Sequence, residues 1–375
     1  MARVRFGDVV KEIKININRA TDNHEFYIAG EHMETENIHL TKRGRFEGSD
    51  VGPAFIRLFR PGQVLYGSRR TYLKKVAVAD FEGITSNTTF VLETKDQHVL
   101  MQELLPFIML TDSFTEYAIR NSKGSTNPYI LFSDLCAYEF ELPSIEEQHV
   151  LAKRLLACDS VKEAYKRLLT ATDELVKSQF IEMFGRPEDW SDELEYLGDH
   201  IDLINGFAFL SENFSEDGIP VIKIRNVNTA DFSRGNMQYH PYDPSLKKYI
   251  VEPGDLLISL TGTVGKEDFA NVCLADNTYD TYYLNQRNAK LVPHEELTKE
   301  FLLHFLKYDY IKRKLIKQGT GVRQCHLHNK DINEIQLIIP SKDKQSEFAK
   351  VTHQSYKSKY VARQATSNLR TYGIL

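Results

Sequence analysis

The chain lacks the features of secreted, membrane-spanning and zinc-binding proteins. Its four cysteines, at positions 136, 158, 273 and 325, form no C-x-x-C pair, which excludes a disulfide framework and a finger-type zinc site. No apolar run reaches membrane-spanning length, and the N-terminus MARVRFGDVV has no hydrophobic signal-peptide region. We therefore expect a cytoplasmic protein with no membrane association.

Motifs of nucleotide-dependent and DNA-modifying enzymes are also missing. An adenine methyltransferase needs a glycine-rich cofactor loop and an N-P-P-aromatic loop, whereas residues 127–129 (Asn-Pro-Tyr) have one proline only. A phosphate loop needs G-x-x-x-x-G-K-[ST], and the glycines of residues 261–266 are too close together. A metal-dependent nuclease motif could be placed on Asp80 and residues 93–95, but so short a pattern can arise by chance. Residues 325–328 (Cys-His-Leu-His) could ligate a metal, but no second pair of ligands stands at a suitable spacing. We predict no catalytic residue, cofactor or metal on this chain.

The most informative stretch is 144–185, which has no Gly or Pro before its last residue. Ser144 and Glu147 form a capping-box pattern, and Gly185 followed by Pro187 is a helix stop. These signals predict one helix of roughly 60 Å, at 1.5 Å per residue. Apolar or aromatic residues recur along it at Leu151, Leu155, Cys158, Val161, Tyr165, Leu168 and Leu175. So narrow a seam predicts pairing with one partner helix, whereas a long helix lying on its own domain would show a wider stripe.

The halves of the chain on either side of this helix repeat each other. Residues 61–65 (PGQVL) return at 253–257 (PGDLL), and 142–148 (LPSIEEQ) return at 339–345 (IPSKDKQ), with Lys344 in place of Glu147. Strand-like and helical segments share each half, so we predict a tandem duplication of α/β (α+β) domains. The predicted parts are a domain at 1–143, a helix at 144–185, a domain at 186–340 and a helix at 341–375. We expect the two helices to pair as an antiparallel coiled coil, the second through Phe348, Tyr360 and Leu369.

Positive charge is concentrated locally although the formal net charge is −5. Between positions 42 and 75 there are nine basic and two acidic residues, interleaved with glycines and tyrosines. Such a patch fits a polyphosphate partner, although a solvated face balanced by nearby carboxylates is the commoner explanation of a charge run. The residues that we predict to contact DNA here are Lys42, Arg43, Arg69, Arg70, Tyr72, Lys74 and Lys75.

The second half has its own basic cluster between positions 307 and 330, next to loops rich in hydrogen-bonding side chains. Arg and Lys can read guanine and Asn or Gln can read adenine in the major groove. Most loop Asn and Gln residues are nevertheless turn residues. The predicted DNA contacts are Thr261, Thr263, Lys266, Asn285, Gln286, Arg287, Lys317, Arg323 and Gln324.

Taken together, the motifs and the order in which they recur in the two halves resemble the specificity subunit of type I restriction-modification systems. The resemblance rests on the two P-G-[DQ]-[VL]-L strand starts, the stretch 67–76, the L-P-x-x-x-E-Q joint and the helix exit at 180–185 (FIEMFG). It implies two target-recognition domains that each read one half of a bipartite double-stranded DNA sequence, with the helices fixing the gap. It also implies docking of two methyltransferase subunits, which use S-adenosylmethionine, and of motor-nuclease subunits, which use ATP and Mg²⁺. Leu151, Leu155, Tyr165, Leu168 and Leu175 then serve either partner docking or helix pairing.

Two other functions are compatible with the sequence. A stand-alone DNA-modifying or DNA-cleaving enzyme fragment would show methyl transfer or metal-dependent cleavage without partners. A helical protein-interaction scaffold would fail to bind any duplex, even with its partner subunits and at any salt concentration.

Overall fold

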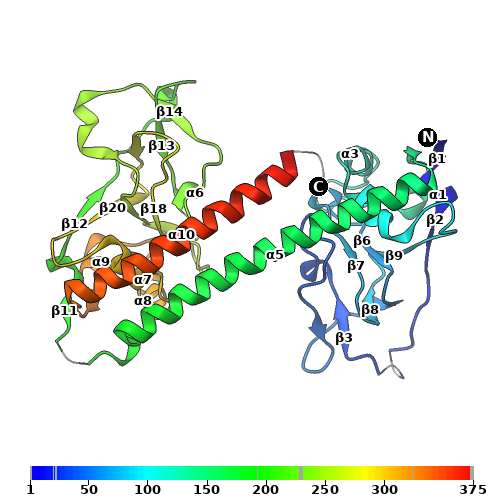
Figure 1. Cartoon of the computed structure of the whole chain (residues 1–375), viewed down its shortest axis with the longest axis horizontal. Coiled ribbons are helices and arrows are strands. Elements are labelled where there is room, and N and C mark those ends of the chain that lie inside the picture. The colour runs from blue at the N-terminus through cyan, green and yellow to red at the C-terminus, as the bar shows by residue number, and fades with distance from the viewer. Residues whose placement is uncertain are drawn as a thin grey trace. The chain divides into compact units, whose positions relative to one another are not determined.

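The computed structural model describes residues 2–19, 21, 23–191, 193–227, 231–322 and 324–371, without the side chains of residues 360 and 362–371. It divides into two units, Met1–Ala164 with Thr366–Leu375, and Tyr165–Ala365. Each unit contains helices and strands, which confirms the predicted fold class (Figure 1). Among the described residues, no helix has the length and apolar character needed to cross a membrane.

Two four-stranded sheets form the first unit, in the orders β2-β9-β6-β7 and β4-β3-β8-β5. All their strand pairs are antiparallel except β3–β8. The strands are β2 (Val10–Glu12), β3 (Phe26–Ile28), β4 (Gly44–Arg45), β5 (Phe55–Phe59), β6 (Val64–Gly67), β7 (Val76–Val78), β8 (Gly83–Ser86) and β9 (Thr89–Thr94), while β1 (Ala2–Arg5) pairs with β10 (Glu139–Leu142). The helices are α1 (Phe6–Val9), α2 (Leu105–Leu110), α3 (Asp112–Arg120) and α4 (Phe132–Leu135).

The second unit repeats the order of both four-stranded sheets and adds a two-stranded pair at residues 261–263 and 324–326, and the shared order confirms the tandem duplication. Its sheets have the orders β12-β20-β16-β18 and β14-β13-β19-β15, and β13–β19 is again the parallel pair. The strands are β11 (Glu195–Tyr196), β12 (Ile201–Asn205), β13 (Ile219–Ile222), β14 (Gln238–His240), β15 (Ile250–Val251), β16 (Leu256–Ser259), β17 (Thr261–Thr263), β18 (Val272–Leu274), β19 (Tyr282–Leu284), β20 (Asn288–Pro293), β21 (Gln324–His326) and β22 (Gln336–Leu337). The helices are α6 (Ile224–Val227), α7 (Lys299–Lys307), α8 (Asp309–Gln318) and α9 (Asn329–Asn333).

Gly7 in the first unit and Gly198 in the second have the same packing role. A Cβ atom on Gly7 would lie 2.6 Å from Cβ of Cys136, and a Cβ atom on Gly198 would lie 2.6 Å from Cβ of Asn333. Both distances are too short for real side chains, so each first turn must carry glycine to approach the opposite segment.

The long helix α5 runs from Ile145 to Phe184, within one residue of the bounds predicted from its caps. The Ser144 amide donates to the Glu147 carboxylate (2.9 Å) and the Glu147 amide donates to the Ser144 hydroxyl (3.3 Å), which is a capping box. Gly185 ends the helix with a φ of 78°, the left-handed conformation in which glycine is least strained. Figure 1 shows α5 (green) as one unbroken helix.

The residues that α5 buries are not the ones predicted. Leu151, Leu168 and Leu175 are 39%, 45% and 53% exposed, so the interpretation of these residues as a helix-pairing seam is wrong. The buried stripe lies on another face and includes polar side chains: it consists of Gln148, Ala152, Asp159, Lys162, Thr172, Val176, Phe180 and Phe184. Of the predicted residues, Leu155 is half-buried and packs on the core of the first unit, and Tyr165 is half-buried.

The second long helix, α10 (Lys342–Thr371), pairs with the C-terminal part of α5 inside the second unit. Phe348 stacks edge-on against Phe180 and Phe184, with centroid distances of 5.7 and 5.4 Å. Farther along, Lys359 forms an ion pair with Asp173. Residue numbers rise on one helix as they fall on the other, which confirms the antiparallel pairing, and Phe348 lies in this contact. The side chains of Tyr360 and Leu369 lie outside the described residues.

An equivalent buried glutamine joins each domain to its long helix. Gln148 accepts from the amide of Met101 (3.0 Å) and donates to the carbonyls of Val99 (2.8 Å) and Pro143 (3.0 Å). Gln345 makes the corresponding bonds, at 2.7 to 2.8 Å, to the amide of Thr298 and the carbonyls of Glu296 and Pro340. Both glutamines are fully buried. The second unit has Lys344 where the first has Glu147, and this difference leaves the joint intact because the glutamine side chain makes the contacts between domain and helix.

Candidate nucleic-acid interface

Three loops of the first unit meet at Ser68, directly after β6. The Ser68 amide and hydroxyl donate to the carbonyl of Thr88, at 3.1 and 2.6 Å, in the turn between β8 and β9. The Ser68 carbonyl accepts from the amide of Ile130 (3.0 Å), at the end of the loop 123–129. The loop 67–75, the turn at 87–88 and the loop 123–129 thus form one cluster, which we call the first loop cluster.

The second unit builds the corresponding cluster around Leu260. The Leu260 amide donates to the carbonyl of Arg287 (2.9 Å), and its carbonyl accepts from the amide of Leu327 (2.8 Å). Pairing of β17 with β21 sets Thr261 opposite His326 and Thr263 opposite Gln324. The segment 260–270, the turn 285–287 and the loop 318–328 form this second loop cluster, so the structure brings together side chains that were predicted separately.

In the first loop cluster, Arg69, Arg70 and Tyr72 are exposed as a DNA contact requires, and Tyr72 is 53% exposed. The Arg69 guanidinium lies 6.0 Å from the centre of the Tyr129 ring, and Arg70 Nε donates to the Asn127 side chain (3.2 Å). The neighbouring loop therefore orients the two arginines, and both remain exposed.

Two other predicted residues of this loop have structural partners instead. The Lys74 ammonium pairs with the carboxylates of Asp112 (2.7 Å) and Glu36 (3.1 Å), and its side chain is 18% exposed. The Lys75 ammonium donates to the carbonyl of Gly30. Their charges are used inside the domain, so these two lysines position the loop.

Lys42 and Arg43 are exposed but belong to the other sheet of the first unit. The Arg43 guanidinium lies 3.9 Å from the centre of the Phe26 ring, on β3. Both residues precede β4, outside the first loop cluster as defined above.

In the second loop cluster one predicted threonine is buried, and the other is exposed with its hydroxyl bonded to Asp268. Thr261 is 4% exposed, because its side chain points into the domain. The Thr263 amide and hydroxyl both donate to Asp268 at 2.7 Å. The two threonines shape the β17 turn, whereas Lys266 is exposed and Gln324 is half-buried opposite Thr263.

The turn 285–287 supplies further polar side chains. Gln286 and Arg287 are exposed and Asn285 is half-buried, with its side-chain oxygen accepting from the Arg287 amide (3.4 Å). Lys317 is exposed at the end of α8. Arg323 lies outside the described residues.

Sequence reasoning missed Asn87, Tyr129 and His326 as members of the loop clusters. Asn87 and His326 are exposed, and Tyr129 is 39% exposed. Backbone bridges join Arg69 and Lys123 to Tyr129, and β17 and Thr320 to His326. The offset of the repeat, 197 residues between Tyr129 and His326, would have identified these positions as equivalent.

A basic groove of about 350 Å³ lies beside α8 in the second unit. Lys177 and Asp309 form an ion pair across it at 2.8 Å, and the Lys314 ammonium lies 4.8 Å from the centre of the Tyr310 ring. Arg313, Lys314 and Lys317 are exposed on its wall. The groove thus presents three cations next to the loop that begins at Gly319.

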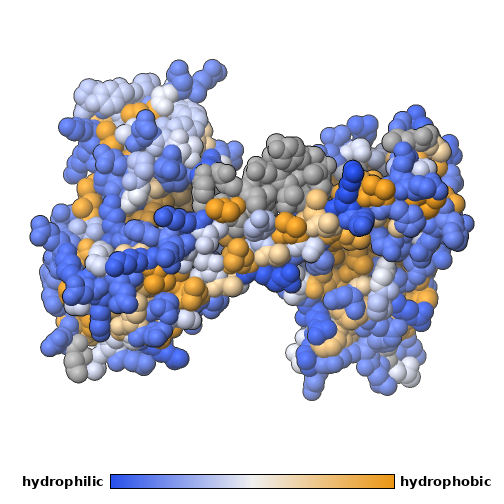
Figure 2. Space-filling model, viewed as in Figure 1, coloured by the Kyte–Doolittle hydropathy of each residue, from blue (hydrophilic) through white to orange (hydrophobic). Residues whose placement is uncertain are grey.

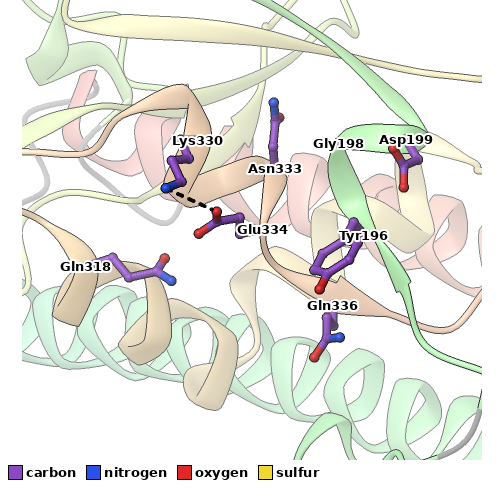
Figure 3. Close-up of a pocket in the computed structure, with 8 residues that line it drawn as sticks. All are labelled: Tyr196, Gly198, Asp199, Gln318, Lys330, Asn333, Glu334 and Gln336. Atoms are coloured by element: carbon purple, nitrogen blue, oxygen red, sulfur yellow. Dashed lines mark ion pairs between the residues drawn. The ribbon is translucent and has the colours of Figure 1, made fainter.

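A larger pocket of about 800 Å³ is lined by residues of the second unit, among them Gln318 at the end of α8 (Figure 3). The Lys330 ammonium and the Glu334 carboxylate form an ion pair at 3.5 Å on one wall, opposite Tyr196 and Gln336. Its lining is polar and contains no nucleophile placed beside a base. In the part of the chain that the structure describes, no group of three or more His, Cys, Asp or Glu residues could hold a metal ion.

Helix α5 carries several exposed apolar side chains among its exposed charged ones. Figure 2 shows hydrophobic side chains (orange) gathered along this helix. The exposed apolar residues of α5 include Leu151, Val161, Leu168 and Leu175, which are 39% to 53% exposed. Side chains of this type at helical spacing form a surface suited to a partner helix.

Comparison with known proteins identifies both halves of the chain. The family model described as "Type I restriction modification DNA specificity domain" matches residues 19–170 and again residues 187–362. Together the two matches cover most of the chain, and each contains one of the loop clusters.

Individual relatives carry the same description. The type I restriction enzyme MjaVIII specificity subunit of Methanocaldococcus jannaschii is 24% identical over 295 residues, which is 72% of this chain and 66% of that protein. The EcoDI specificity subunit of Escherichia coli is 28% identical over 131 residues, 34% of this chain and 28% of that protein. The chain thus spans just under two thirds of the length of the first relative and 28% of the length of the second. The type I restriction-modification S subunit from M. genitalium has a similar fold, with a TM-score of 0.59 at 16% identity over 99% of this chain and 93% of that one.

Proposed function

The chain belongs to the type I restriction-modification DNA specificity family, and we propose that each of its two domains reads one half of a bipartite DNA sequence. The observation that carries the proposal is the repeated loop cluster. Ser68 and Leu260 hold three loops together through the same backbone hydrogen bonds in the two domains. Exposed Arg, Lys, Gln and aromatic side chains on these loops have the donors and rings needed for phosphates and base edges.

The proposal extends to the long helices and to partner subunits. We propose that α5 and α10 set the gap between the half-sites and that methyltransferase subunits dock on the exposed apolar face of α5, including Leu151, Leu168 and Leu175. Motor-nuclease subunits complete the assembly. In this scheme S-adenosylmethionine, ATP and Mg²⁺ are bound by the partners, and this chain contributes recognition only.

A methylation map tests the function directly. Adenine methylation is mapped across the genome in cells that express the chain with its neighbouring methyltransferase subunit, and in cells that lack only this chain. We expect one two-part motif with a constant gap to lose methylation when the chain is absent. An identical map in both strains would refute the assignment.

Replacing both Arg69 and Arg70 by alanine is expected to weaken binding to the cognate duplex about 100-fold, because each specific arginine contact contributes roughly 1–3 kcal/mol. Both side chains are exposed, so the midpoint of thermal unfolding should stay unchanged. Fluorescence anisotropy with the assembled complex measures the affinity. The matched control is Arg3→Ala with Arg5→Ala, which removes the same charge from β1. Equal affinity losses in the two double variants would contradict the assignment of the 67–75 loop.

The basic groove beside α8 is expected to contact phosphates. Replacing Arg313 and Lys314 by alanine should reduce the slope of log K against log salt concentration by about 2, because each phosphate contact contributes roughly 0.9 to that slope. Preference between cognate and altered duplexes should not change. Lys247→Ala with Lys248→Ala, at another exposed site of the same unit, is the control. An unchanged slope in the groove variant would remove this surface from the interface.

A further inference from the structure

The segment 34–41 lies between the long helix α5 and the loop 67–75 of the first domain, which we call the reading loop. It is held in shape by its own side chains: Asn37 donates to Glu34 (3.0 Å), the His39 amide donates to Asn37 (3.0 Å), and Thr41 donates to Glu34 (2.8 Å). Its Ile38 carbonyl accepts from the amide of Val78 on β7 (2.8 Å). We call residues 34–41 the tether segment.

On one side the tether segment binds the loop 67–75. The Glu36 amide donates to the carbonyl of Lys74 (3.2 Å), and the Glu36 carboxylate pairs with the Lys74 ammonium (3.1 Å). Asp112, the first residue of α3, pairs with the same ammonium (2.7 Å). Burial opposes the charge on Lys74, but the hydrogen bonds to Asp112 and Glu36 prevail and raise the pKa of Lys74.

On the other side the tether segment binds α5 through two buried charged residues. The Lys162 ammonium donates to the carbonyl oxygen of Glu36 (3.1 Å), and Lys162 is 7% exposed. The Asp159 carboxylate, on a residue that is 4% exposed, lies 2.5 Å from Nε2 of His39. Glu36 therefore contacts the helix through its carbonyl and the reading loop through its amide and carboxylate.

The backbone at this junction is strained. Glu36, Arg70 and Lys74 have φ values of 54°, 51° and 45°. Six non-glycine residues within the described ranges have positive φ, and these three of them lie along this one connection. Side chains disfavour that conformation, so the surrounding contacts must hold it, as is common where a binding loop is pre-organised.

We infer that Glu36 is a positioning residue for DNA recognition. It connects the loop that carries Arg69 and Arg70 to the helix α5, through its contacts with Lys74 and Lys162. This inference rests on the proposed function and adds to it. The geometry of the first half-site contact is then set by the long helix as well as by the domain core. Loosening the tether should reduce discrimination in the first half-site and leave the second half-site unaffected.

Two variants separate this role from general stabilisation. Glu36→Gln removes the charge that pairs with Lys74 and keeps the length of the side chain. Lys162→Met removes the ammonium that binds the Glu36 carbonyl and keeps an unbranched apolar chain that can stay buried. The control is Lys153→Met, the same substitution at an exposed position of the same helix.

The experiment measures binding of the assembled complex to duplexes that carry the mapped motif, with single base changes in either half. For Glu36→Gln and Lys162→Met we expect the ratio of cognate to altered affinity to fall about tenfold for changes in the first half-site and to stay constant for the second. Lys153→Met should match the wild type in both. Unchanged ratios, or equal losses in both half-sites, would overturn the inference. A wild-type complex that prefers no duplex would instead overturn the proposed function, and the inference with it.

Discussion

Replacing Gln148 by alanine is expected to lower the free energy of unfolding by about 3–4 kcal/mol. The side chain is fully buried and bonds to one backbone amide and two backbone carbonyls, from Met101, Val99 and Pro143. Alanine leaves these three groups without partners in a site closed to water, and each unsatisfied buried group costs roughly 1–3 kcal/mol, offset in part by local relaxation. The first turn of α5 should then separate from the domain.

Denaturant unfolding followed by circular dichroism measures this loss. Gln179→Ala on the same helix is the matched control, because Gln179 is half-buried and donates to a side chain of its own helix, Glu182, three residues away. Hydrogen exchange should show faster opening at the start of α5 in Gln148→Ala alone. Stability within 0.5 kcal/mol of the wild type would show that the joint does not depend on this glutamine.

Replacing Phe348 by alanine should destabilise the second unit by about 3–5 kcal/mol, the range measured for truncation of a buried phenylalanine. Phe348 is fully buried between Phe180, Phe184 and His304. Its ring is thus an apolar contact through which α10 holds α5. Loss of this ring should weaken the pairing of the two helices.

The histidine beside Phe348 provides a second measurement. Desolvation by burial lowers the pKa of His304 to about 3, so this side chain is neutral at physiological pH. Opening the site admits water and should raise this pKa toward its usual value of about 6.5, which NMR titration can follow. Tyr242→Ala, which removes an exposed aromatic ring of the same unit, is the control. A stable variant with an unchanged His304 titration would contradict the expected role of Phe348.

The sequence was sufficient to predict the parts of this fold that depend on local signals and on repetition. Ser144, Glu147 and Gly185 mark the ends of α5 because capping acts within a few residues. The duplication was visible because turns and joints recur at a nearly constant offset. Arg69, Arg70 and Tyr72, which we predicted to contact DNA, are exposed, in line with the rule that a basic loop with glycines is rarely core.

The predictions that failed depend on partners far away in the sequence. The apolar spacing of α5 suggested a seam through Leu151 and Leu168, yet the helix buries Asp159 and Lys162. Their burial is made tolerable by His39 and by the Glu36 carbonyl, more than 100 residues earlier. Likewise Lys74 is paired with Asp112 and Glu36, so a count of basic residues could not show that its charge is already used.

The polar residues in the buried stripe of α5 also bear on wrongly assembled states of the protein. An all-apolar stripe could slide along its domain by one turn at little cost, because one leucine replaces another. In this helix such a shift would withdraw the buried carboxylate of Asp159 from His39 and the buried ammonium of Lys162 from the Glu36 carbonyl. Breaking a buried charged contact costs roughly 3–5 kcal/mol, so a helix in the wrong register is penalised far more than a merely loosened one. The polar residues thus reduce the apolar stabilisation between α5 and its domain, and they favour a single register of the helix on that domain.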